Sequence, residues 1–192
     1  MALTKVIGSG LGAIPAISGA NLTGLTAGQL PAGSVVQVQF LQIDTTVASI
    51  SVSANTDTVV TQLTVNITPS STSSIIRLDT HIFHEWANAA APTEAAWYFY
   101  RDSTKLAASA AGSRLTGISM SKLSFHNDNT STPEIASYSY FDQPSSTSQI
   151  TYKVGVKNHF ATNFSLNRTK NDSDGTQSER GISFISATEI GG

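Results

Sequence analysis

The sequence predicts an all-β protein, with an antiparallel β-sandwich head of jelly-roll type preceded by an extended N-terminal arm. Three observations support this fold class. From Gly33 onward, apolar residues recur at every second position, which is the period of a strand with one buried face. Clusters of Pro, Ser, Asn and Gly separate these runs at short intervals, as in sandwiches and jelly rolls. No segment has a sustained helical period.

The first 34 residues form a segment of their own. Glycine and proline interrupt residues 1–34 too densely for a helix or a long strand, yet the segment is too apolar for a plain linker. An apolar segment that has no core of its own can become ordered on a partner. We therefore expect an arm that docks on a partner subunit or trimerises, the alternatives being an arm folded back on its own domain or a disordered one. The residues expected to dock are Ile7, Leu11, Ile14 and Ile17.

The head, residues 35–192, divides into nine or ten short predicted strands. In the first of them, Val38 and Phe40 alternate with glutamines, so their side is predicted to face a core. Two strands around Tyr138 and Ile150 flank the turn sequence Gln143–Ser146, and we predict that they pair as a hairpin. The predicted strands are residues 36–40, 48–52, 59–67, 76–86, 96–100, 115–125, 138–140, 150–156, 160–166 and 182–190.

Composition excludes several classes of function. Charged residues make up 12% of the chain, the net charge is −2 and the basic residues are scattered, so nucleic acid is not an expected partner. The chain has no cysteine, which excludes disulfides, cysteine-based zinc sites and a thiol nucleophile. No apolar run is long enough to span a bilayer, so membrane insertion is not expected.

Five segments resemble, in this order along the chain, a small all-β module found at the ends of bacteriophage fibres and on other virion surface proteins, especially those of marine phages. The resemblance implies a β-sandwich, often trimeric, that is displayed on the virion as a fibre tip or surface decoration. It carries over no functional residue. Ser103 departs from the glycine that often follows Arg-Asp in such proteins, and the chain lacks a long repetitive shaft. The five segments are residues 22–38, 67–76, 99–105, 141–154 and 183–190.

Two polar clusters are candidate metal sites, and each also has a simpler structural interpretation. On a strand, His81 and Glu85 share one face while His84 points to the other, so they make an incomplete metal site unless His126 or His159 completes it. The alternative is a hydrogen-bonded polar pair at a strand end or subunit interface. The run Asn171-Asp172-Ser173-Asp174-Gly175 resembles part of a calcium loop, but no Glu follows at the required spacing and Asp174-Gly175 is also typical of a tight hairpin turn.

Aromatic residues suggest a carbohydrate surface. Aromatic rings stack on sugars, and they also fill sandwich cores, so both interpretations stay open. The candidate glycan contacts are Trp86, Trp97, Tyr98, Asn127 and Asp128. We expect no enzymatic activity and no cofactor, because no paired carboxylates, no nucleophile motif and no phosphate loop can be identified.

The sequence therefore predicts a structural phage virion protein that displays its head for attachment to a host surface. The expected partners are further copies of the chain in a homotrimer, other virion proteins through the arm, and host glycan. If the chain self-associates, we expect more apolar side chains than are needed to fill one core. The alternatives are a capsid decoration protein or head fibre that stabilises the shell, and a glycan-binding receptor-recognition module.

Overall fold

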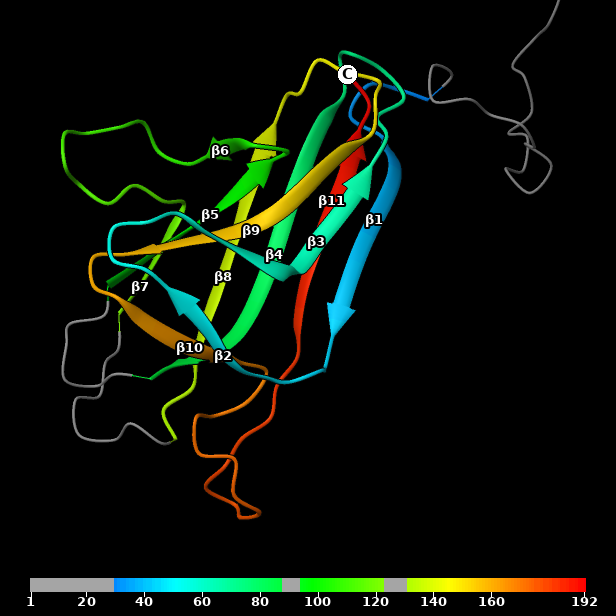
Figure 1. Ribbon diagram of the computed structural model, residues 1–192. Helices are drawn as coiled ribbons and strands as arrows, with labels where there is room; N and C mark the ends of the chain where they lie inside the picture. The colour runs from blue at the N-terminus through cyan, green and yellow to red at the C-terminus, as the bar shows by residue number, and fades with distance from the viewer. Residues whose placement is uncertain (1–29, 88–93, 123–130) are drawn as a thin grey trace, which may run out of the picture.

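Two antiparallel β-sheets pack face to face in the described part of the protein (Figure 1). The computed structural model describes residues 30–87, 94–122 and 131–192. Within these ranges the regular structure is entirely β-strand, as the sequence predicts, and no helix there could cross a membrane. The strands are β1 (Val35–Ile43), β2 (Val47–Val52), β3 (Thr58–Ile67), β4 (Ile75–Trp86), β5 (Glu94–Arg101), β6 (Thr104–Leu106), β7 (Ser119–Lys122), β8 (Glu134–Asp142), β9 (Ile150–Asn158), β10 (Thr162–Leu166) and β11 (Ser183–Ile190).

The first sheet, sheet A, is built around β4. Along one edge of β4, β11 pairs with residues 75–81 and β10 with residues 84–86, while β8 pairs along the opposite edge with residues 76–84. Next to β11 lies β1, and next to β10 lies β2. The strands β1 and β8 therefore form the two outer strands of the main part of this sheet.

The second sheet, sheet B, has the order β3-β9-β5, with β6 and β7 side by side along the remaining edge of β5. If β6 and β7 count as one interrupted strand and the short β2 and β10 are set aside, eight main strands remain. Numbered in chain order, these eight run 1-8-3-6 in sheet A and 2-7-4-5 in sheet B. This order is the jelly roll, in which two Greek keys interlock.

The core lies between the sheets and is made by alternate residues of each strand. From β4, the side chains of Ile76, Leu78 and Ile82 point inward and are fully buried. At one end of the core, Trp86, Trp97 and Phe164 pack with their ring centroids between 5.0 and 6.0 Å apart. Each large apolar side chain buried in this way contributes about 1.5–3 kcal/mol to folding. The alternation predicted from sequence is therefore the pattern that fills this core.

The predicted hairpin between residues 138–140 and 150–156 is wrong. Both segments are strands, but β8 pairs with β4 in sheet A while β9 pairs with β3 and β5 in sheet B. The segment 143–149 carries the chain from one sheet to the other, and Ser145 within it has a φ of 50°. A period of two shows which side chains are buried, but it does not show which strand is the partner.

A buried carboxylate, Asp142, links the two sheets at the point where this crossing begins. Arg101 at the end of β5 donates from Nη1 to both oxygens of Asp142, at 2.9 and 3.2 Å. The Tyr152 hydroxyl of β9 donates to Oδ2 at 2.7 Å. Burial, followed by this hydrogen bond, raises the pKa of Tyr152, so the hydroxyl remains a donor. A second contact between the sheets is the hydrogen bond from the Tyr138 hydroxyl to the Tyr98 carbonyl, at 3.0 Å.

Smaller differences concern strand ends. The turns after β2 and β5 contain Asn55 and Asp102, and both residues have a positive φ. The strand predicted at 115–125 is shorter, because β7 begins at Ser119, and residues 123–130 lie outside the described chain. The first strand begins at Val35, where the sequence places the start of the head. Of the predicted arm, residues 1–29 lie outside the described chain.

Replacing Asp142 with alanine should destabilise the head by about 3 kcal/mol, because breaking a buried charged pair leaves its partners unpaired. Urea unfolding followed by tryptophan fluorescence measures this change. Asp174→Ala is the matched control, since Asp174 is exposed and its replacement should change the free energy of unfolding by less than about 0.5 kcal/mol. Equal stabilities for the two variants would contradict a linking role for Asp142.

Candidate functional site

The three aromatic residues predicted to contact a glycan are buried. Trp86, Trp97 and Tyr98 each have 0% of their surface exposed. Trp86 and Trp97 belong to the core between the sheets, where Trp97 also donates from Nε1 to Ser121 at 2.7 Å. A side chain with no exposed surface cannot stack on a sugar ring, so this prediction is wrong for these three residues, and the alternative of core packing holds for Trp86 and Trp97.

Tyr98 is buried for a different reason from the tryptophans. Its side chain lies on the outer side of sheet B, where the Lys105 ammonium covers the ring at 3.8 Å from its centroid. The hydroxyl donates to Asp57 Oδ1 at 2.7 Å. Burial raises the pKa of Tyr98, and the bond to Asp57 raises it further. Gly155 lies beneath the ring, and a Cβ atom there would collide with it. This position therefore requires glycine.

Several predicted site residues lie outside the described chain. These are the two loop residues proposed for glycan contact and the four apolar residues of the arm, together with one candidate metal ligand. They are Asn127, Asp128, Ile7, Leu11, Ile14, Ile17 and His126.

The His81–Glu85 pair serves structural contacts. His81 Nδ1 lies 3.0 Å from the Ser137 hydroxyl, and its ring stacks on Phe184 at 6.0 Å. Glu85 is fully buried, and it accepts hydrogen bonds from the backbone N–H of Thr132 at 3.1 Å and of Lys170 at 2.6 Å. It therefore fixes the segments on either side of it. No group of three His, Asp or Glu residues that could hold a metal ion occurs in residues 30–87, 94–122 and 131–192.

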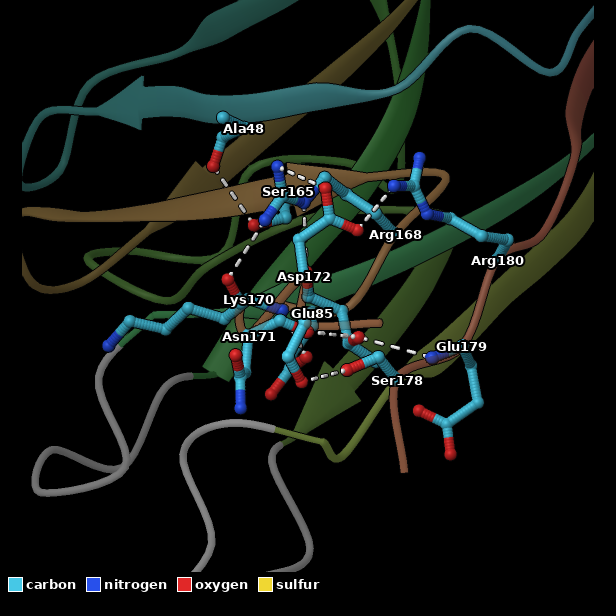
Figure 2. Close-up of polar contacts among 12 residues, drawn as sticks. Ala48, Glu85, Ser165, Arg168, Lys170, Asn171, Asp172, Ser178, Glu179 and Arg180 are labelled. Carbon is cyan, nitrogen blue, oxygen red and sulfur yellow. Dashed lines mark hydrogen bonds and ion pairs between the residues drawn. The ribbon is translucent and has the colours of Figure 1, made fainter. Parts of the chain in front are cut away.

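The candidate calcium loop is organised by ion pairs (Figure 2). Asp172 lies between two guanidinium groups, with Arg168 Nη1 at 3.0 Å and Arg180 Nη2 at 2.5 Å. A calcium ion would have to compete with both cations for this carboxylate. The predicted tight turn at Asp174-Gly175 falls two residues later, because the Ser178 N–H donates to the Gly175 carbonyl at 3.0 Å and Thr176 and Gln177 are the central residues. The loop is therefore held by hydrogen bonds and ion pairs of its own.

Among the hollows on the described surface, two are relevant to the predicted sites. The larger, of about 450 Å³, lies beside β7 and is within the size range of small-ligand sites. Met120 and Leu115 supply apolar surface there, while Arg114, Glu94 and Ser121 supply charged and polar groups. The smaller, of about 270 Å³, is formed by the loop that holds Asp172 and Arg180.

The most apolar surface of the described chain is the outer side of sheet A. The strand register places nine apolar side chains on this side, drawn from all four main strands. Phe40 is 72% exposed and Phe141 is 60% exposed, although they lie on the opposite outer strands β1 and β8. We call this surface the sheet A outer face, and its apolar residues are Val35, Val38, Phe40, Ile75, Phe83, Ile135, Phe141, Phe184 and Ile190.

This face also corrects a prediction. The sequence places the Val38 and Phe40 side of the first strand against the core. In the structure Gln37 and Gln39 are on the inner side, opposite Glu189 and Ala187, and the apolar side faces outward. The alternation along β1 does identify an apolar side. It does not show whether that side packs against the core of the same chain.

The outer side of sheet B differs sharply. It carries Thr64 and Asn66 from β3 and Lys153 and Lys157 from β9. Of the exposed large hydrophobic residues in the described chain, Met120 on β7 belongs to this sheet, and none lies on β3, β5 or β9. Outward-facing positions of a sandwich are normally polar, so the three longest strands of sheet B have the usual surface and the main strands of sheet A do not.

Comparisons with known proteins give structural similarities only. No protein-family model matches the chain, and no curated protein matches its sequence. Among solved structures, the chain is similar to VP2 of infectious bursal disease virus in a subviral particle, with 10% sequence identity and a TM-score of 0.34. The match covers 82% of this chain and 42% of the viral protein.

His84, between the two residues of the predicted pair, is buried on the inner side. Its ring lies 4.9 Å from that of Trp97, and Nδ1 lies 3.2 Å from the Ile82 carbonyl oxygen. Burial lowers the pKa of His84 from 6.5 to about 4, and the contact with the Ile82 carbonyl opposes this only in part. The Glu134 carboxylate, 3.8 Å from Nε2, also favours the protonated ring, but complete burial outweighs it.

The stability of the head should therefore fall as the pH falls from 6.5 toward 4. In this window the unfolded state takes up a proton on His84 and the folded state does not. At about 1.4 kcal/mol per pKa unit, the loss is on the order of 3 kcal/mol. Urea unfolding of the wild type and of His84→Gln across this window measures it, and the variant should show a flatter dependence.

The carboxyl groups whose pKa is shifted affect the stability of the head only at lower pH. Burial raises the pKa of Asp57 and Glu189, but hydrogen bonds outweigh it, and the net pKa of each carboxyl is lowered. Their stabilisation is lost only as the pH falls below about 4.5. Equal slopes for the wild type and His84→Gln between pH 6.5 and about 5 would contradict the assignment to His84.

Proposed function

We propose that this chain is a non-enzymatic structural protein of a bacteriophage virion, of the fibre or appendage type, whose head attaches the particle to a host surface. The observation that carries the proposal is a jelly-roll head with one outer face left apolar, as in a subunit built to pack into an assembly. Jelly rolls are a common architecture of viral capsid and lectin domains. The five segments that resemble phage fibre modules support the same conclusion.

The buried acids of the described chain support a structural role. Asp142 joins the sheets, and Glu85 binds two backbone N–H groups. Glu189 accepts hydrogen bonds from Ser70, Ser74 and Gln37, at 2.5–2.7 Å. Each carboxylate is thus engaged in holding strands and loops together. General acid–base chemistry requires a carboxyl group that can reach a substrate.

Display and adhesion form the mechanism that we propose. The chain associates as a homotrimer and docks on other virion proteins through its N-terminal arm. Many copies on one particle, each binding weakly, would together bind a host surface with high avidity. A surface poor in charge suits contact with neutral glycans through hydroxyl and amide groups.

Immunogold labelling of purified virions tests the proposal, with antibodies raised against the head. We expect labels on fibres or short appendages. Labels spread evenly over the capsid shell would instead favour the decoration protein that the sequence leaves open. Free protein in the lysate with no label on any particle would show that the proposal is wrong.

A glycan-binding role is the second candidate, and the hollow beside β7 favours it. Its lining combines the exposed Met120 with the charged groups of Arg114 and Glu94. The segment 123–130, which holds the predicted contacts Asn127 and Asp128, directly follows β7 in the chain.

If the head binds glycan there, Arg114→Ala should weaken binding to host envelope polysaccharide about tenfold or more, because a hydrogen bond to a charged group contributes roughly 1.5–3 kcal/mol. Biolayer interferometry with immobilised polysaccharide measures this. Arg180→Ala, at the other hollow, is the control and should bind like the wild type. Equal binding by all three proteins would exclude the hollow as the glycan site.

A further inference from the structure

We propose that the sheet A outer face is the surface through which copies of this chain associate. The inference rests on the self-association within the proposed function and names the surface responsible. Its occupant is a second copy of this chain.

The size of the face fits a specific interface. It spans the four strands β1, β11, β4 and β8, and the β4 residues on it run from Ile75 to Phe83. With strands about 4.8 Å apart and residues about 3.3 Å apart, this corresponds to roughly 500 Å² of sheet on each copy. Covering this face with an equal area of a second copy would remove about 1,000 Å² from water, which reaches the lower limit for a specific interface.

The charges on the face favour a second copy. At its centre, Arg77 donates from Nη2 to Asp79 Oδ1 at 2.9 Å, and the Ser139 hydroxyl donates to the same oxygen at 2.6 Å. The face thus carries the Arg77–Asp79 pair among serine, threonine, histidine and apolar side chains. Another copy offers both signs again, so each charge can find its complement across the contact.

The width of the face argues against the N-terminal arm as its occupant. The most exposed apolar side chains, Phe40 and Phe141, lie on strands three positions apart in the order β1-β11-β4-β8. One extended segment covers a strip about one strand wide, or roughly 5 Å. Residues 1–29 also contain Lys5 as their single charged residue and therefore offer no carboxylate. A second folded head is wide enough to cover both edges of the face.

The unpaired edge of β1 also supports this surface as the site of association. In the described chain β1 pairs only with β11, so its other edge is unpaired. Exposed edge strands usually carry charges or proline that prevent pairing with other chains. The sequence of β1, VVQVQFLQI, has neither. A free and uncharged edge next to Val38 and Phe40 is consistent with burial in an assembly.

Size-exclusion chromatography with light scattering of the full-length chain tests this proposal. The wild type should run as an oligomer, at a multiple of the 20.2 kDa monomer mass. The double variant Phe40→Ser/Phe141→Ser should run at the monomer mass and keep the circular dichroism of a β protein. Met120→Ser/Phe160→Ser is the matched control, since both residues are exposed apolar side chains outside the face, and it should stay oligomeric.

Three outcomes would overturn the proposal. The first is a wild type that is monomeric at every concentration from micromolar upward. The second is a folded Phe40→Ser/Phe141→Ser variant that keeps the wild-type mass. The third is a monomeric wild type whose face binds a hydrophobic dye only after residues 1–29 are cleaved off, because the arm would then be the occupant. Labelling of virions is independent of all three, so failure of this inference and failure of the proposed function remain distinguishable.

Discussion

A two-layer sandwich buries only the inner face of each sheet. The rest of this structure depends on which side chains lie on the two outer faces. The inner faces meet in a core whose largest side chains are Trp86, Trp97, Tyr152 and Phe164. The outer face of sheet B carries lysine and threonine, which water solvates well. The outer face of sheet A carries phenylalanine, valine and isoleucine. The sandwich alone gives no reason for this asymmetry, whereas a further layer packed on sheet A does.

Polar groups that enter the interior do so at the ends of strands, where they hold loops and crossings. Asp142 stands where the chain leaves sheet A for sheet B, and Glu85 stands where β4 ends. Glu189 binds the loop around Ser70 and Ser74 from the last strand. A buried carboxylate is costly unless it accepts several hydrogen bonds, so these acids indicate points where the fold must be fixed precisely. The same arrangement explains why Glu85, a candidate metal ligand in the sequence, is engaged in hydrogen bonds to two backbone N–H groups.

The sequence was sufficient for the fold class and for most strands, because a period of two and the turn residues are local properties. The strand with which a given strand pairs is not a local property. The strands around Tyr138 and Ile150 look like a hairpin because a Pro/Ser turn lies between them, yet a crossing between sheets uses the same residues. Burial in β5 was equally hard to predict, since Tyr98 faces outward and is covered by Lys105 from the next strand. For β1, alternation identified an apolar side correctly, and only the structure shows that this side lies outside the core.

A face used for self-association and a site used for host contact can operate together only if they do not overlap. The sheet A outer face involves β1, β11, β4 and β8, whereas the hollow at Arg114 and Met120 lies beside β7, on the edge of sheet B. Association through sheet A would therefore leave each hollow open in every copy. It would also bring several hollows into one rigid unit, and linked sites bind a multivalent surface far more tightly than single ones. The division between the apolar outer face of sheet A and the hollow at the edge of sheet B would thus allow a small head of low charge to assemble and still present its loops to a partner.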